Sequence, residues 1–463
     1  MPTEDNFIVA IELGSANVTA IVGNKQPDGT ILVHALAQEK SESFIRKGRI
    51  NNFTKMTSCL EGMKSKLEEQ LHMTITGAYV GIGGMGMHTV GNTVTRHLSD
   101  KILITADIVR NVIDSNLSMP GGDREILEVI PQDYKLGTQV VAEPEGIASD
   151  SIEGHFLNIV ASASLREDVT KCFAAAGLKV MGMPISVLTL ADAILTEPEK
   201  RSGCVFVDMG AETTSVAIYK NNLLRHLAVI PLGGASINRD ICTLQIEDAE
   251  AESLKRQYAI AFHEDTEDDH APITLSDGRS VKYETFSALV QARLEEIILN
   301  VNHQISLSPY DRTQLIAGLV VTGGASLMRG MDKAYEAYTG FDRLRIVKGM
   351  RLQYKADPSL LIAPGFNADG SCNTAIAIID KGDLNCCGGQ IGAETSEPES
   401  VVETVTAAVP PSVPEEPAET AETQPAPRPK PGMSAFKRFW RNIANKASNM
   451  VSDDEERFPG SKS

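Results

Sequence analysis

The sequence is poor in aromatic residues and in cysteine motifs, and it has no excess of basic residues. Only 5% of its 463 residues are aromatic, and one of them is tryptophan. The seven cysteines form no Cys-x-x-Cys pair, so we expect reduced thiols and no disulfide framework. The formal net charge of −18 argues against nucleic acid as the main ligand, because a phosphate backbone is bound through an excess of Lys and Arg.

Long apolar runs are also missing. The chain holds no run of about 18 apolar residues, the length that a membrane-spanning helix needs. Its start, Met1 to Asp5, is acidic and lacks the hydrophobic core of a signal peptide. We therefore expect an intracellular protein that does not span a bilayer. With 42% apolar residues, the chain is long enough to bury cores in more than one domain.

Two similar glycine turns stand out, one near residue 14 and one near residue 210. The first segment, Ile8 to Asn17, reads IVAIELGSAN, and the second, Cys204 to Thr214, reads CVFVDMGAETT. Each consists of an apolar strand, an acidic residue, a glycine and small residues, and a second β-rich run follows. A triphosphate needs a concave turn of backbone N–H groups, and small residues let the backbone come close to it. The pattern predicts two facing hairpins that bind phosphate.

A third turn follows the apolar strand in Leu319 to Met328, which reads LVVTGGASLM. Here the Gly-Gly pair opens a predicted helix, so that the backbone can pack flat against an adenine or a ribose. The order of two phosphate turns and one adenosine turn is similar to that of the actin-like ATPase superfamily. The alternative is three unrelated glycine turns.

Strand and helix patterns divide the chain into two strand-rich α/β halves. We predict an α/β fold of the actin-like, two-lobed kind, with duplicated domains and a small α+β subdomain inserted in the first lobe. The predicted parts are the first-lobe core (1–84 and 153–198), the inserted subdomain (85–152), the second-lobe core (199–246 and 305–385), a second-lobe insertion (247–304), a disordered linker (386–432), an amphipathic helix (433–451) and an acidic tail (452–463).

The C-terminal segment has a composition of its own. The linker is rich in Glu, Pro, Thr and Ala, so it cannot bury enough apolar surface to order itself. Apolar residues then recur at spacings of three and four from Met433 to Met450, which predicts one apolar stripe on a helix. A basic amphipathic helix lies in a membrane interface and is attracted to anionic lipid. A helix that docks on a protein surface is the alternative. The predicted membrane contacts are Phe436, Phe439, Trp440, Ile443, Lys437, Arg438 and Arg441.

The whole chain resembles the FtsA family of bacterial cell-division proteins. The resemblance is carried by both phosphate turns, the Gly-Gly turn and the terminal basic helix, and by segments between them: Lys47 to Asn52 (KGRINN), Val129 to Tyr134 (VIPQDY), Ala176 to Leu178, Arg225-His226, and Ile230 to Gly234 (IPLGG).

This resemblance implies a function as well as a fold. Proteins of this family bind ATP, polymerise and lie at the division septum on the cytoplasmic face of the inner membrane, held by the terminal helix. They recruit the tubulin-like FtsZ through the second-lobe insertion, and later division proteins join them. Arg293 aligns with a basic residue that the family directs at the acidic FtsZ tail; a plain surface arginine is the alternative.

The resemblance also implies a binding site for ATP and Mg. Asp208 would hold Mg through water, and Gly233-Gly234 would open a helix toward the nucleotide. Glu252 and Lys255 would reach ribose and adenine, unless they are an ordinary solvated pair at i, i+3. The other implied contacts are Gly14, Ser15, Ala16 and Asn17 in the first turn, Gly210, Ala211, Glu212, Thr213 and Thr214 in the second, and Gly323, Gly324, Ala325 and Met328 in the third.

Two departures from the family pattern bear on catalysis. Glu212 stands where such turns often carry Gly, and Ser215 stands where many carry Asp. The segment Met183 to Val187 offers no Gln or Glu to orient water, which general-base hydrolysis needs. We therefore assign no catalytic residue and expect tight binding with slow or undetectable turnover.

Two other classes share the superfamily. A small-molecule kinase would need an acceptor-site Asp between the lobes and would have no use for a membrane helix. A pilus-assembly ATPase would dock on a short peptide of a membrane partner and would lack the tethered helix.

The terminal helix generates the first prediction. Burial of its apolar face should supply several kcal/mol, at about 25 cal/mol per Å2, and each basic residue near anionic lipid adds roughly 1 kcal/mol. Trp440→Glu should therefore release the protein from anionic liposomes, whereas Lys437→Ala should only weaken binding and make it less salt-sensitive. Co-sedimentation with liposomes measures both. Full pelleting of Trp440→Glu would reassign the helix to a protein partner.

Overall fold

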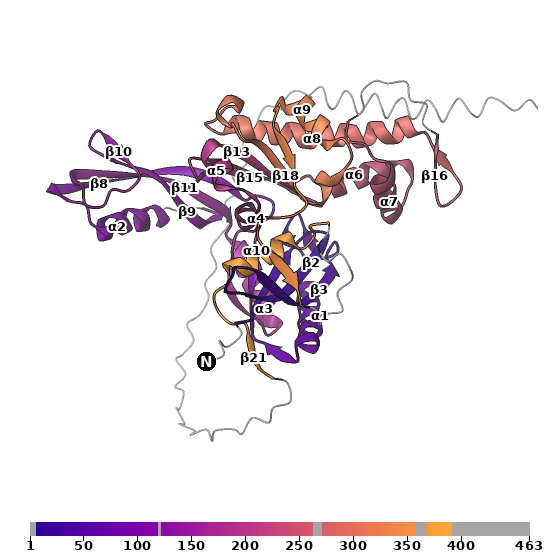
Figure 1. Cartoon of the computed structure of the whole chain (residues 1–463), viewed down its shortest axis with the longest axis horizontal. Helices are drawn as coiled ribbons and strands as arrows, with labels where there is room; N and C mark the ends of the chain where they lie inside the picture. The colour runs from indigo at the N-terminus through magenta and orange to yellow at the C-terminus, as the bar shows by residue number, and fades with distance from the viewer. Residues whose placement is uncertain (1–5, 119–121, 263–270, 358–366, 368, 391–463) are drawn as a thin grey trace, which may run out of the picture. The chain divides into compact units, whose positions relative to one another are not determined.

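The computed structural model describes residues 6–118, 122–262, 271–357, 367 and 369–390 of the chain, and Figure 1 labels their elements. The predicted helix 433–451, its seven membrane contacts, the acidic tail and nearly all of the predicted linker lie outside these residues. The described part buries three hydrophobic cores, in a first lobe, an inserted subdomain and a second lobe, and the first of these cores also includes second-lobe residues such as Cys204, Phe206 and Val320. Among the described residues, no helix has both the length and the apolar character needed to cross a membrane.

The first lobe is built on a six-stranded sheet in the order β12-β7-β1-β2-β3-β20. Strand β1 pairs antiparallel with β2 and parallel with β7, and its first four residues are buried, as expected for a strand covered on both faces. Helices α1 and α3 pack on each other, while α10 packs on β1, β2 and α4. The bounds are β1 Ile8–Leu13, β2 Asn17–Lys25, β3 Ile31–Lys40, β4 Ile45–Arg46, β5 Arg49–Ile50, α1 Phe53–Leu71, β6 Met73–Ile75, β7 Gly77–Gly81, α3 Ser164–Ala175, β12 Lys179–Gly182, α4 Ser186–Ile194, β20 Tyr354–Ala356, α10 Asn373–Lys381 and β21 Cys387–Gln390.

The second lobe repeats this plan. Strand β13 pairs antiparallel with β14 and parallel with β18, just as β1 pairs with β2 and β7. The predicted duplication of the hairpin is therefore present in the structure. The bounds are α5 Glu197–Ser202, β13 Cys204–Met209, β14 Thr214–Lys220, β15 Leu223–Ile230, α6 Gly234–Ile241, α7 Asp248–Tyr258, β16 Ile273–Thr274, β17 Ser280–Val281, α8 Tyr283–Leu307, β18 Gly318–Thr322, α9 Met331–Thr339 and β19 Leu344–Ile346, with 3₁₀ segments at Cys242–Leu244, Arg312–Gln314 and Gly324–Leu327.

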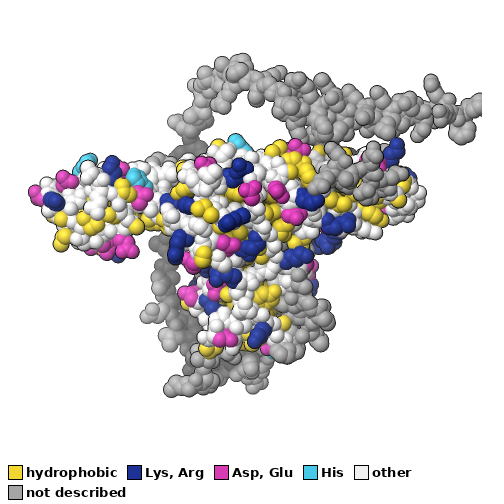
Figure 2. All heavy atoms as spheres, turned by 45° about the horizontal axis from the view of Figure 1, so that its top comes forward, with side chains coloured by type: hydrophobic (Ala, Val, Ile, Leu, Met, Phe, Trp, Pro, Cys, Tyr) yellow, Lys and Arg dark blue, Asp and Glu magenta, His cyan; other side chains and the backbone are white. Residues whose placement is uncertain are grey.

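The inserted subdomain is a helix on a sheet, in which β11 pairs antiparallel with both β8 and β9. Its core holds Phe156 edge-on to Tyr134, with ring centroids 6.1 Å apart, and Leu103 and Val140 remain about 60% exposed. Hydrophobic side chains show on this subdomain at the left of Figure 2. The bounds are β8 His88–Leu103, α2 Ala106–Leu117, β9 Arg124–Leu136, β10 Gln139–Val141 and β11 Ala148–Ser162.

The inserted subdomain is joined to the second lobe through strand β15. Ala228 of β15 pairs with His88 of β8, which makes the two sheets continuous. The Arg225 guanidinium donates to the Gln132 side-chain oxygen at 2.8 Å, and the Gln132 amide donates to the Leu224 carbonyl. The Val-Ile-Pro-Gln segment is thus part of the contact between the two units.

Several predicted boundaries differ from the structure. β11 continues past residue 152, because it stays paired with both neighbours. β20 and α10, predicted as second-lobe core, complete the sheet and core of the first lobe. β21 pairs with β6, so ordered chain extends beyond the predicted start of the linker at 386. The Gly-Gly turn opens a 3₁₀ segment instead of an α-helix.

Candidate nucleotide-binding site

Two carboxyl groups hold equivalent places at the ends of the duplicated hairpins. Glu12 is the next-to-last residue of β1, and Asp208 is the next-to-last residue of β13. Each lies two residues before the glycine of its turn. Burial raises the pKa of Glu12 to about 8, with a further rise from the charge of Asp208. Burial also raises the pKa of Asp208 to about 6. Burial therefore disfavours the charged form of both carboxyl groups, and the charge of Asp208 further disfavours ionisation of Glu12.

Glu12 was not among the predicted site residues. The signal that points to it was present, since an acid precedes the glycine at the same spacing in both turns. Its second partner has no sequence signal, because the Thr374 hydroxyl that hydrogen-bonds Glu12 comes from α10, far along the chain.

The first turn is tight and is tied to its surroundings. A Cβ on Gly14 would lie 2.5 Å from the Asn17 carbonyl oxygen, so only glycine allows this closure. Ser41 donates its hydroxyl to the Gly14 carbonyl at 2.6 Å and its N–H to the Ala16 carbonyl. The Ser15 hydroxyl accepts the Gly48 N–H at 2.8 Å. The turn is thereby fixed before any ligand arrives.

The second turn meets the start of α6. The Gly210 N–H donates to the Thr213 carbonyl at 2.9 Å within the turn, and the Gly234 and Ala235 N–H groups donate to the Gly210 and Ala211 carbonyls. A Cβ on Gly233 would lie 2.5 Å from the Gly210 oxygen. The Gly210 turn and the start of α6 are therefore in direct contact.

The third turn packs on the second. Gly323 has a φ of 90°, and a Cβ there would lie 2.6 Å from Oδ1 of Asp208. The Ala325 methyl group approaches the Cβ position of Gly234 to 3.2 Å. Gly324 faces open space, and Met328 packs on the second-lobe core. The second turn thus contacts the start of α6 through Gly210 and Gly233, and the third turn through Asp208 and Gly323.

Glu252 and Lys255 form an internal pair beside this meeting point. The Lys255 ammonium lies 2.6 Å from Glu252 and donates to the Gly234 carbonyl. Burial alone would raise the pKa of Glu252, but hydrogen bonds from Lys255, Arg256 and Asn238 lower it to about 2. In the described part of the chain, Oδ1 of the buried Asn238 has no hydrogen-bond partner. A ligand that brings a donor would satisfy it.

Two residues of the second turn have other partners than predicted. The Thr214 side chain is fully buried and donates to the Leu232 carbonyl at 2.9 Å. The Glu212 carboxylate accepts from the Arg46 guanidinium at 3.0 Å and from the Lys47 N–H at 2.5 Å. Both side chains are therefore engaged in protein contacts.

Arg293 is paired within the chain. The guanidinium forms a two-point ion pair with Asp240 of α6, at 2.5 and 2.9 Å, and also contacts Glu296. Its side chain is 17% exposed. An acidic peptide that binds Arg293 would have to compete with these resident carboxylates.

Comparison with known proteins identifies the class and then the family. The protein-family model described as cell division protein FtsA matches residues 205–365, and the family model for the SHS2 domain inserted in FtsA matches residues 84–160. The chain is 29% identical to the FtsA of Neisseria meningitidis serogroup B over 338 residues, which is 72% of this chain and 81% of that protein. It is 27% identical to the FtsA of Escherichia coli K12 over 342 residues, 71% of this chain and 81% of that protein.

Among solved structures, the PilM–PilN complex of type IV pilus biogenesis matches with a TM-score of 0.54 and 13% identity, over 81% of this chain and 98% of that chain. At this identity the likeness shows the fold alone. The duplicated hairpins and the fold define an actin-like protein with an inserted SHS2 subdomain. The chain belongs to the FtsA family of cell-division proteins.

The raised pKa of Glu12 generates a prediction about pH. Between the usual pKa of 4.5 and about 8, the folded protein keeps a proton that the unfolded chain releases. The free energy of unfolding therefore falls as the pH rises through this window. Glu12→Gln removes the ionisable group, so it should raise the melting temperature at pH 8 by roughly several degrees and change it less at pH 5.

Thermal unfolding in buffer with EDTA at both pH values measures this effect. Glu61→Gln, on the exposed face of α1, is the control and should show no pH-dependent difference from the unaltered protein. An equal effect of Glu12→Gln at the two pH values would contradict the protonation of Glu12.

Proposed function

We propose that this chain is an ATP-binding division protein that polymerises on the cytoplasmic face of the inner membrane, anchors FtsZ filaments there and recruits later division proteins. The single observation that supports it best is the contact of the Gly210 turn with both the start of α6 and the Gly323 turn, which suits a bound nucleotide. The assignment to the FtsA family supplies the biological context.

Residues from all three turns would hold the nucleotide. Phosphates would lie between the backbones of the Gly14 and Gly210 turns, and the adenosine would lie between the Gly323 turn and the Glu252–Lys255 pair. Asp208 would hold Mg through water.

Turnover of ATP should be slow. A general base must accept a proton from the attacking water, and the Glu12 carboxyl, with a pKa of about 8, holds its own proton near pH 7. The Glu212 carboxylate is occupied by Arg46 and Lys47. Neither Glu12 nor Glu212 is therefore well suited to activate water.

The membrane and partner contacts rest on the sequence and the family. The basic helix 433–451 would insert Phe436, Trp440 and Ile443 into anionic lipid, at the division septum. The second-lobe insertion, which includes α7 and α8, would bind the FtsZ tail. Because Arg293 is paired internally, this contact does not depend on its charge.

ATP with Mg should stabilise the protein, because a ligand that binds only the folded state shifts unfolding by mass action, by about 2.7 kcal/mol at a hundred times Kd. Gly210→Val should abolish this shift, since a Cβ at 210 already lies 3.1 Å from the Thr213 oxygen. Gly91→Val is the control, because its Cβ would meet open space. Thermal unfolding with and without Mg-ATP measures the shift in melting temperature. If Gly210→Val shows the same shift as the unaltered protein, this turn is not part of the site.

Assembly generates a separate prediction. With ATP, the full chain should form filaments on anionic lipid monolayers through head-to-tail contacts, and these filaments should recruit added FtsZ. Trp440→Glu should leave the lipid bare while keeping its ATP-induced thermal shift. Electron microscopy that shows only scattered monomers at several protein concentrations would contradict polymerisation.

A further inference from the structure

A two-residue turn in the first lobe is bonded to both phosphate turns. Lys47 and Gly48 connect β4 to β5, with φ values of 50° and 74°, as a tight hairpin turn requires. The Lys47 N–H donates to the Glu212 carboxylate in the second turn at 2.5 Å. The Gly48 N–H donates to the Ser15 hydroxyl in the first turn at 2.8 Å. The Lys47–Gly48 turn therefore bridges the two lobes beside the proposed phosphate site.

The same turn also holds the segment that leads into the inserted subdomain. The Met85 N–H donates to the Lys47 carbonyl at 2.8 Å. Gly48 and Gly84 pack so closely that a Cβ on either would lie 2.6 Å from the backbone of the other. Further along, the Val229 N–H of β15 donates to the Met87 carbonyl. Residues 83–87 are thus fastened to the Lys47–Gly48 turn at one end and to the second lobe at the other.

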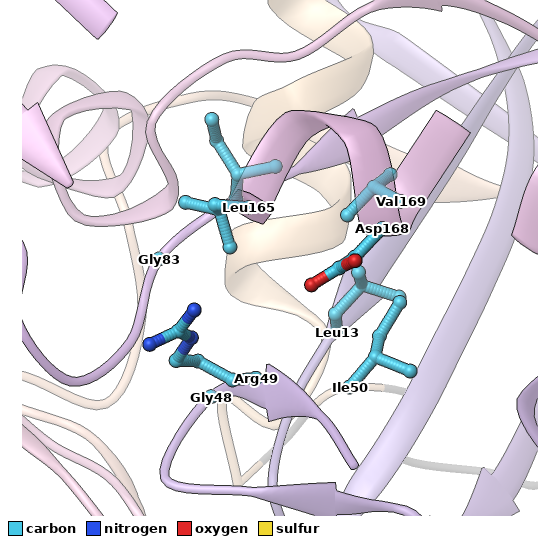
Figure 3. A pocket seen from close by; sticks show the side chains of 9 residues that line it. Leu13, Gly48, Arg49, Ile50, Gly83, Leu165, Asp168 and Val169 are labelled. Atoms are coloured by element: carbon cyan, nitrogen blue, oxygen red, sulfur yellow. The ribbon is translucent and has the colours of Figure 1, made fainter. Parts of the chain in front are cut away.

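A small cavity marks the place where both connections of the inserted subdomain meet. It is lined by Leu13 of β1, by Gly48 and Arg49, by Ile82 and Gly83 at the entry to the subdomain, and by the start of α3, which follows its last strand. Figure 3 shows the Arg49 and Asp168 side chains at this cavity. The first strand, the Lys47–Gly48 turn and both connections of the inserted subdomain therefore face one another at this cavity.

Glu212 is the charged member of this arrangement. Its side chain is 8% exposed, whereas that of its partner Arg46 is 58% exposed. A buried carboxylate depends on its donors, since leaving it without them is costly, and hydrogen bonds to a charged acceptor are strong ones. The contacts of Glu212 with Arg46 and Lys47 thus tie the second phosphate turn to the first lobe.

We propose that Glu212 is a positioning residue that, through the Lys47–Gly48 turn, couples the phosphate turns to the inserted subdomain. The proposal rests on the proposed nucleotide site. A ligand held by both phosphate turns fixes the spacing between Ser15 and Glu212. The Lys47–Gly48 turn is bonded to both residues and to Met85, so a change in this spacing displaces residues 83–87. Such coupling is reciprocal, because what the nucleotide does to the subdomain, the subdomain does to nucleotide affinity.

Hydrogen exchange of the full-length protein, with and without saturating Mg-ATP, tests the coupling. In the unaltered protein, ATP should slow exchange in peptides that cover residues 45–50 and 83–88. Arg46→Glu repels the Glu212 carboxylate from an exposed position. It should reduce the ATP response at 83–88 at least twofold, while the response at the start of α6 persists.

The control is Lys66→Glu, which reverses the equally exposed partner of another carboxylate, Glu39, on the same lobe. It should leave the response at 83–88 unchanged. An equal response at 83–88 in Arg46→Glu and in the unaltered protein would overturn the proposal.

Failure of the nucleotide site would look different. In that case no peptide of the unaltered protein, including 208–214, would respond to ATP. The coupling is then tested by hydrogen exchange without nucleotide. Arg46→Glu should exchange faster than Lys66→Glu in peptides that cover residues 83–88. Equal exchange in these two variants would refute the role of Glu212 independently of ATP.

Discussion

The arrangement of the second lobe depends on backbone segments that approach too closely for a side chain. Gly210, Gly233 and Gly323 each sit where a Cβ would lie between 2.4 and 3.1 Å from a neighbouring atom. Their contact brings together the hairpin of β13 and β14, the start of α6 and the turn after β18. Asp208, the Glu252–Lys255 pair and the buried Asn238 take their places from this contact. A larger residue at Gly233 or Gly323 would separate the parts of the site, whereas one at Gly210 would crowd the Thr213 oxygen within its own turn.

Short-range patterns in the sequence predicted the parts of the fold that are local. Apolar runs that end in an acid and a glycine gave both hairpins, and the Gly-Gly pair located the third turn. Strand β8 was not predicted, because its residues are mostly polar and exposed. The placement of β20 and α10 in the first lobe depends on pairing with strands more than three hundred residues away, which no local pattern records.

Charged residues show most clearly what sequence alone leaves undetermined. Glu212, Arg293 and Lys255 all stand in segments that suggest a ligand. In the structure, Glu212 binds Arg46 and Lys47, Arg293 binds Asp240, and Lys255 binds Glu252. A desolvated charge requires an opposite partner, and the identity of that partner is set by tertiary packing. Glu12 is the converse case, since the symmetry of the two turns indicated its role and only the fold placed it near Asp208.

The return of the chain to the first lobe has a consequence for synthesis on the ribosome. Strands β1, β2, β3, β7 and β12 have all been made by residue 182, but the sheet still lacks β20, and its core lacks α10, which ends at Lys381. At about 5–20 residues per second, the ribosome needs roughly 10–40 s to supply them. During that interval the apolar face that α10 covers and the open edge of β3 are exposed to other chains. The first lobe is therefore the last part to be completed, and its exposure before release is a demand on the chaperones of the cell.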